Sequence, residues 1–235
     1  QDTHRPPEVD SLLEATARGL ALWMTFEDPI RVADLKTRGS RFVRVREEVR
    51  APPGQLLGIT EFVRPRVEEI AGTVPAGVGR WLLRSPRIRG RLARWTGGKQ
   101  IRTSTLGGFV LLYMLAGLRR WRRGTLRFQE ENARIEEWLG RIERHAQSSY
   151  ALALEVARAQ RLVRGYGDTH ERGWRNFTTL MSQLDSLASR QDGALWLARL
   201  HAASLADEEG VTLRSTLEEL RASGTTHAQV ERVGV

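Results

Sequence analysis

The stretch from residue 125 to residue 163 constrains the fold most strongly, because it contains no proline and only one glycine, Gly140. Its charges are of mixed sign. Proline and glycine are the residues least tolerated inside helices, so their near absence favours helices throughout this stretch. Further helices are predicted over residues 168–190, 192–209 and 212–222.

The first half of the sequence is also predicted to be largely helical. Asp28 and Pro29 are typical of a helix N-cap followed by a first-turn proline, and residues 40–50 have an amphipathic helical pattern. Within residues 8–24, five apolar side chains fall mostly along one helix face: Val9, Leu12, Leu13, Leu20 and Trp23.

These segments predict an all-α fold, a bundle of roughly eight to ten helices with a short irregular or extended segment near residues 51–63. A composition of 40% hydrophobic and 28% charged residues is too apolar for a disordered chain. We expect residues 1–224 to form one helical domain. Because the chain starts at Gln1 without an apolar signal segment, we interpret this domain as a piece of a larger polypeptide. Residues 225–235 are expected to form a flexible tail.

The absence of cysteine excludes disulfides, thiolate-held iron–sulfur clusters and cysteine zinc sites in this chain. It fits a reducing compartment, and we expect a cytoplasmic protein. His145, His170 and His201 have no partner at the four-residue spacing that two metal ligands on one helix require, so no metal site is expected. No catalytic residue can be assigned from the sequence, because no nucleophile motif is present.

Positive charge is concentrated in the first half. The net charge is +9, and residues 31–123 hold 21 Lys and Arg against six Asp and Glu. A basic block at residues 80–102, which includes Lys99 and Arg102, has eight basic residues, no acidic ones and two tryptophans. Three interpretations stay open: pairing with an acidic surface of this chain or another subunit, binding of an anionic ligand, and binding of nucleic acid. No known nucleic-acid motif supports the third, which is kept as the alternative.

Residues 103–118 form a run of 16 uncharged residues. A membrane-spanning helix needs about 20 predominantly apolar residues, so no span is expected. The run predicts a central core helix that is apolar all round because other helices surround it. The alternative is an interfacial membrane anchor, formed with Trp121 and the four arginines of residues 119–123.

The stretch RLVRGYGDTHERGWRNF, residues 161–177, has two interpretations. In the first it is a turn between helices: Gly165 takes the left-handed conformation, and Asp168 caps the next helix with Glu171 three residues later. In the second it is a contact site, in which Arg164, His170 and Arg172 surround a helix N-terminus that favours carboxylate or phosphate groups.

Several stretches resemble one protein family. They are RVADLKTRGSRFVRVREEV at 31–49, ITEFVRPRVEEIAGTVPAGVGRWLL at 59–83, GGKQIRTSTLGGFVLLYMLAGLRRWR at 97–122 and the stretch at 161–177. Together they sample most of residues 28–180. The sequence is similar to the helical C-terminal region, a domain without an assigned function, of bacterial indolepyruvate oxidoreductase β subunits and their fused forms. These enzymes belong to the 2-oxoacid:acceptor oxidoreductase family.

This resemblance implies a parent enzyme that converts aryl-pyruvates to aryl-acetyl-coenzyme A with thiamine diphosphate, magnesium and iron–sulfur clusters. The chain lacks the cluster cysteines and the Gly-Asp-Gly and asparagine motif that holds the diphosphate, so no cofactor is expected to bind to it. The resemblance implies an accessory domain that packs on the catalytic core or another subunit, with coenzyme A or aryl-pyruvate as possible ligands. The candidate contact residues are Arg164, Tyr166, Asp168, His170, Arg172, Lys99 and Arg102, and Tyr166 is suited to stack on an aryl substrate.

Overall fold

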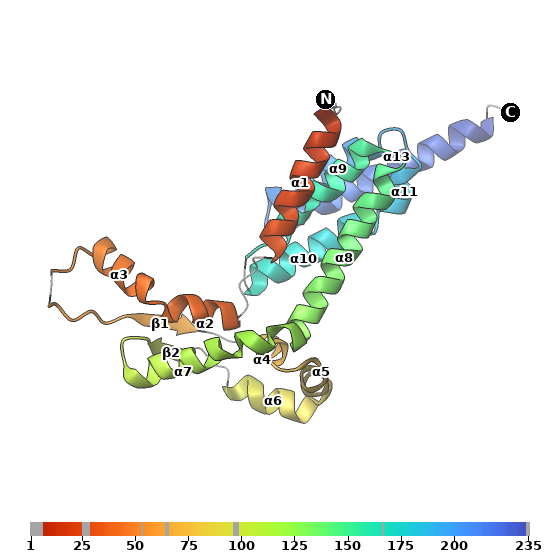
Figure 1. Cartoon of the computed structure of the whole chain (residues 1–235). Coiled ribbons are helices and arrows are strands. Elements are labelled where there is room, and N and C mark those ends of the chain that lie inside the picture. Colours follow the sequence, from red (N-terminus) through yellow and green to blue (C-terminus); the bar gives the residue numbers. More distant parts are fainter. Residues whose placement is uncertain are drawn as a thin grey trace. The chain divides into compact units, whose positions relative to one another are not determined.

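The computed structural model describes residues 7–24, 29–52, 54–63, 66–95, 99–165 and 167–233 (Figure 1). The chain is 81% helical, which confirms the all-α prediction. The thirteen α-helices of the described residues exceed the predicted eight to ten because several predicted helices are divided by short turns.

In chain order the helices are α1 (Pro7–Met24), α2 (Pro29–Thr37), α3 (Gly39–Glu48), α4 (Val67–Thr73), α5 (Ala76–Arg84), α6 (Pro86–Trp95), α7 (Leu106–Gly117), α8 (Leu126–Ala146), α9 (Tyr150–Ala159), α10 (Gly167–Met181), α11 (Leu184–Ala188), α12 (Gly193–Ala206) and α13 (Val211–Val233). Two 3-10 helices, η1 (Leu118–Gly124) and η2 (Gln160–Leu162), and two strands, β1 (Thr60–Val63) and β2 (Lys99–Arg102), complete the elements.

The chain divides into two compact units. Unit 1 comprises Gln1–Thr25 and Ile135–Val235, and unit 2 comprises Phe26–Arg134. Residues 1–224 were expected to form one domain and residues 225–235 a tail. The helix α13 extends to Val233. The two units have net charges of opposite sign: unit 2 has a net charge of +13, and unit 1 has a net charge of −4.

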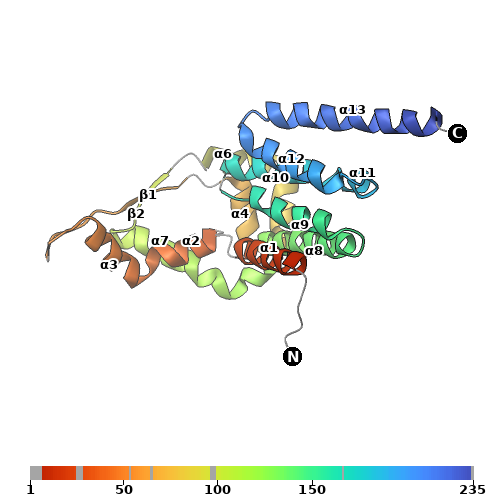
Figure 2. The ribbon, with the colours of Figure 1, turned by 90° about the horizontal axis from the view of Figure 1, so that it is seen from above.

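Unit 1 is a helical bundle in which α9 packs on both α1 and α12, and α12 packs on α13. Figure 2 shows α1, α9, α12 and α13 following one another in this order. Of the predicted apolar face of α1, Leu12 and Trp23 are buried and Leu20 is half-buried. Leu13 is exposed instead, because it lies about 100° round the helix from Leu12.

An aromatic cluster fills the centre of this bundle. Trp138 is fully buried, and its ring lies 5.7 Å from that of Trp23. Phe177 lies edge-on to Trp23 at 5.9 Å and is stacked with Trp174 at 5.5 Å. The indole nitrogen of Trp138 donates to the carbonyl of Val156 at 3.0 Å, so the one polar atom of this buried side chain has its partner.

Unit 2 contains the extended segment that the sequence predicted near residues 51–63. Its residues 60–63 form β1, which pairs antiparallel with β2, so that Thr60 faces Arg102 and Val63 faces Lys99. The Glu61 carboxylate accepts hydrogen bonds from Lys36, at 2.9 Å, and from Arg41, which links β1 to α2 and α3. Burial opposes ionisation of Glu61, but these two cations outweigh it and lower the pKa of the carboxyl.

The uncharged run at residues 103–118 forms α7, but α7 is not a surrounded core helix. It packs on α2 along one stripe, where Leu112 and Ala116 are buried with Ala33. Its opposite side is open: Leu106 is 82% exposed and Met114 is 69% exposed. The prediction of a helix buried all round is therefore wrong. Apolar composition indicates that a helix avoids water but does not say which molecule covers it.

Candidate functional site

The turn in residues 161–177 partly matches its prediction. Gly165 has φ +83°, which confirms the left-handed position after η2. The helix α10 begins at Gly167, so Asp168 lies in its first turn and is not the N-cap. A carboxylate in the first turn favours the helix electrostatically. Tyr166 lies outside the described residues.

The charged residues around this turn differ in their exposure and pairing. Arg164 is exposed, His170 is half-buried, and Arg172 pairs with Glu208 at 3.0 Å. Asn176, one turn further along α10, donates to the carbonyl of Ser204 at 3.3 Å. Arg172 and Asn176 therefore tie α10 to the end of α12 and the segment that follows it, which favours the turn interpretation for Arg172.

The backbone of α10 approaches η2 closely at Gly173, and no sequence pattern indicates this contact. A Cβ atom at this position would lie 2.1 Å from the carbonyl oxygen of Leu162. Only glycine allows the backbone of η2 to approach α10 so closely. This contact fixes the position of η2, which carries Gln160 and Arg161.

The two remaining candidates lie in unit 2. Lys99 and Arg102 are the first and last residues of β2, whereas Arg164, Asp168, His170 and Arg172 all belong to unit 1. Arg102 is exposed, and the side chain of Lys99 lies outside the described residues. The predicted contact residues are thus divided between the two units.

The basic block at residues 80–102 forms an exposed surface over α5 and α6. Arg89 pairs with Glu68 at 2.8 Å, and Trp81 is exposed. On α6, Ile88 and Leu92 face the small core around Val67 and Ala71. All six arginines of the two helices are exposed: Arg80, Arg84, Arg87, Arg89, Arg91 and Arg94.

The acidic residues of unit 2 are engaged by arginines. Asp34 lies 2.7 Å from Arg38, 3.2 Å from Arg31 and 3.6 Å from Arg119. The hydrogen bond from Arg38 lowers the pKa of Asp34 against the opposing effect of burial, and the charges of Arg31 and Arg119 lower it further. The carboxylates of this unit therefore hold its helices together and leave most of its positive charge uncompensated.

An apolar surface runs along α7, α3 and the segment between α3 and β1. We call it the α3/α7 face and define it by exposed side chains. The rings of Phe42 and Phe109 lie 6.2 Å apart, and the exposed ring of Tyr113 stacks with Phe109 at 6.0 Å. A groove of about 760 Å³ lies between α3, residues 56–59 and the start of α7. The members of the α3/α7 face are Val43, Leu56, Leu106, Val110, Leu111, Tyr113 and Met114.

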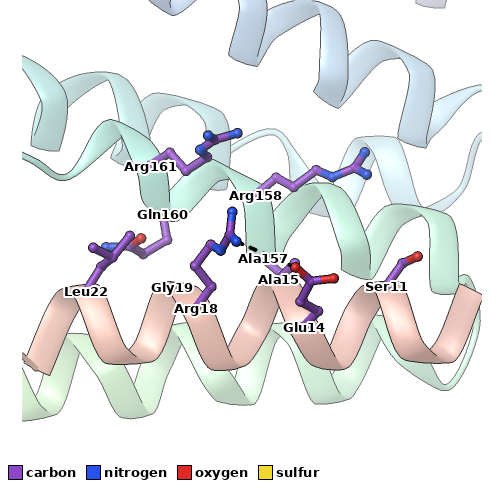
Figure 3. Close-up of a pocket in the computed structure, with 10 residues that line it drawn as sticks. All are labelled: Ser11, Glu14, Ala15, Arg18, Gly19, Leu22, Ala157, Arg158, Gln160 and Arg161. Atoms are coloured by element: carbon purple, nitrogen blue, oxygen red, sulfur yellow. Dashed lines mark ion pairs between the residues drawn. The ribbon is translucent and has the colours of Figure 1, made fainter.

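A smaller pocket, of about 230 Å³, lies in unit 1 between α1 and the end of α9 with η2. Figure 3 shows Arg18 reaching from α1 toward α9, from which Arg158 and, just beyond in η2, Arg161 project. Gln160 forms its inner wall next to Leu22. The sequence could not indicate this site, because its two sides are separated by more than a hundred residues.

Residues 1–183 match a family described only as a family of unknown function, DUF6537. The chain belongs to the DUF6537 family. No curated protein matches the chain, and no solved structure matches it. The matched residues include all of unit 2, and they include α1, η2 and α10 of unit 1. Both the α3/α7 face and the α1–η2 pocket therefore lie within the DUF6537 region, whereas α11, α12 and α13 follow it.

Two histidines of this DUF6537 chain, the buried His145 and the half-buried His201, have lowered pKa values. Burial lowers the pKa of His145, and Arg144 lowers it further. Burial also lowers the pKa of His201, with added effects of Arg161 and Arg158. In the described part of the chain, no group of three or more His, Cys, Asp or Glu residues is placed to hold a metal ion. Among the described helices, none combines the length and apolar character that a membrane crossing requires.

Proposed function

We propose that this chain is an accessory helical domain of an indolepyruvate:acceptor oxidoreductase of the 2-oxoacid family. It packs on the thiamine-diphosphate catalytic core and shapes substrate access or subunit assembly in the cytoplasm. The resemblance of residues 31–49, 59–83, 97–122 and 161–177 supports this assignment. The core supplies thiamine diphosphate, magnesium and the iron–sulfur clusters, since this chain has none of the sequence motifs that hold them.

The main structural support for the proposal is the exposed apolar surface of the α3/α7 face. Large exposed apolar patches on a folded protein mark surfaces that another molecule covers. Leu56, which is 96% exposed, and Leu106, which is 82% exposed, both line the groove of this face. Burying such side chains contributes about 25 cal/mol per Å² of apolar surface. The catalytic core of the same enzyme is the occupant we assign to this face.

Arginines beside the face indicate the charge of the covering surface. The 3-10 helix η1 follows α7 directly, and its Arg120, Trp121 and Arg123 are exposed. Arg46 lines the groove from the side of α3. Complementary charges guide association, so the core surface that covers the face is expected to be apolar at its centre and acidic at its rim.

The double substitution Leu106→Glu with Met114→Glu in the complete oxidoreductase tests this assignment. Both side chains are exposed, so the fold should change in stability by less than about 0.5 kcal/mol. Two buried carboxylates at the interface should weaken association with the core by about tenfold or more. We expect coenzyme A-dependent indolepyruvate oxidation to fall, together with retention of this chain by the core in gel filtration.

Leu195→Glu with Leu205→Glu is the matched control, because it adds two carboxylates at exposed leucines on α12 of unit 1. Equal activity and equal retention for the double variant and this control would refute the docking assignment. Deleting the whole chain from the enzyme gives the upper limit of the effect, provided that the core keeps its cofactor. Flotation of the unaltered chain with anionic lipid vesicles, lost in the double variant, would instead assign the face to a membrane surface.

A second candidate function rests on the exposed arginines of α5 and α6. Arg87, Arg91 and Arg94 recur at the spacing that places residues on one side of a helix, and Trp81 is available for stacking. Such a surface suits binding of single-stranded nucleic acid through phosphates and bases. In this case the chain is an all-α nucleic-acid binding module.

Retention on immobilised single-stranded DNA as salt rises separates the two functions. A nucleic-acid module should lose affinity steeply with salt, and Arg87→Ala with Arg91→Ala should reduce the salt dependence by about two ions. The control pair Arg144→Ala with Arg175→Ala removes the same charge from unit 1. If the two pairs have the same effect, or if the chain is not retained at low salt, the nucleic-acid function is eliminated.

A further inference from the structure

The pocket between α1 and η2 is lined by three arginines and one carboxylate, that of Glu14. Unit 1 has a net charge of −4, yet Arg18, Arg158 and Arg161 all line this one opening (Figure 3). The arginines come from three elements, α1, α9 and η2. More than a hundred residues separate Arg18 from the other two, so they meet only in the fold.

The three arginines differ in how strongly carboxylates of the chain already engage them. Arg158 pairs with Glu155 at 2.6 Å. Arg18 lies 3.7 Å from Glu14, and both side chains are largely exposed, so this pair is weak. Among the described residues no carboxylate lies within ion-pair distance of Arg161. Arg161 and Arg18 are therefore the two cations that remain available to an external anion.

A buried amide forms the inner wall of the pocket. Gln160 is only 2% exposed, and its Oε1 atom is buried without a hydrogen-bond partner among the described residues. Buried polar atoms in folded proteins are nearly always hydrogen-bonded, so an unpartnered one needs an explanation. Gly19 of α1 lies beside this amide and leaves space for Trp138, because a Cβ atom at Gly19 would lie 3.0 Å from the indole ring and 3.5 Å from Oε1.

We infer that this pocket binds a small organic anion that also carries an N–H or O–H group. Its carboxylate or phosphate pairs with Arg161 and Arg18, because guanidinium groups match the geometry of both oxyanions. Its N–H or O–H group donates to Gln160 Oε1 after rotation of the terminal amide, which is a soft torsion. Leu22 and Ala15 contact its carbon skeleton. A volume of about 230 Å³ suits a metabolite rather than a larger cofactor.

The inference is independent of the docking role of the α3/α7 face, and it is tested on the full chain by titration. The probes are 3-hydroxybutyrate with butyrate, and glycerol 3-phosphate with propyl phosphate, at pH 8. Binding is followed by the NMR shifts of the α1 and η2 amides. Saturable shifts are expected, with the hydroxylated probe of each pair bound more tightly. Binding by the carboxylates alone assigns a carboxylate ligand, and binding by the phosphates alone assigns a phosphate ligand.

Three variants decide the outcome. Arg161→Ala should weaken every bound probe by about tenfold, because a charge-assisted hydrogen bond is lost. Gln160→Leu should remove the preference for the hydroxylated probe and leave binding of its partner unchanged. Arg175→Ala, an exposed arginine on α10 that does not line the pocket, is the control and should have no effect. The site is refuted if no probe gives saturable shifts, if Arg175→Ala weakens binding as much as Arg161→Ala, or if Gln160→Leu leaves the hydroxyl preference intact.

Discussion

Gly173→Ala is expected to destabilise unit 1 by about 3 kcal/mol, at the upper end of the usual cost of overpacking. The added Cβ atom would lie 2.1 Å from the carbonyl oxygen of Leu162, and the contact is backbone rather than a flexible side-chain tip. Relief requires α10 and η2 to separate, although Leu162 and Val163 are buried. Urea unfolding followed by circular dichroism measures the loss, and hydrogen exchange of α9 and α10 amides assigns it to unit 1.

Gly140→Ala is the control, and its expected effect on stability has the opposite sign. Gly140 lies on the exposed side of α8, and a Cβ atom there would meet nothing within 4 Å. Alanine favours a helix over glycine by about 1 kcal/mol, so this change should stabilise the chain. If both glycine substitutions shift the unfolding midpoint in the same direction, the close approach of η2 to α10 is not present in solution.

The same substitution links stability to the proposed ligand site. Since η2 carries Gln160 and Arg161, moving η2 away from α10 also moves one side of the α1–η2 pocket. The stretch at residues 161–177 thus has a structural part and a binding part. Its glycines set the backbone, while the residue that we assign to an anion is Arg161 at its start rather than His170 or Arg172.

The all-α class and most helices were predictable because they follow from local rules. Proline-free stretches with helical periodicity form α1, α8, α9 and α12 near the predicted positions. The helix predicted over residues 168–190 is interrupted, because α10 ends at Met181 and α11 begins at Leu184. Ser182 donates its hydroxyl to the carbonyl of Thr179 at 2.7 Å. Serine side chains compete in this way for the hydrogen bonds of the helical backbone. A single serine in a sequence is not enough to predict a helix end.

The environment of α7 and the ligand pocket were not predictable, for two different physical reasons. An apolar helix has the same sequence whether its own domain or another molecule covers it, so residues 103–118 alone could not distinguish a core from a docking surface. The pocket requires Arg18 to meet Arg161, and this contact depends on the packing of α1 against α9. Periodicity predicts which face of a helix is apolar but does not identify its neighbour.

Trp138→Ala is expected to cost about 3–5 kcal/mol, because it removes a fully buried indole and leaves a cavity. The loss extends to the contact with Trp23 and to the hydrogen bond with the Val156 carbonyl. Trp81→Ala, which truncates an exposed indole of unit 2, should cost far less. The two variants are compared by the urea midpoint of unfolding and by hydrogen exchange of the α9 amides.

Because Trp138 also contacts the space beside Gly19, a cavity at this position should loosen α1 against α9 and weaken probe binding in the pocket. If Trp138→Ala shifts the midpoint no more than Trp81→Ala, the aromatic cluster is not the core that holds the pocket together.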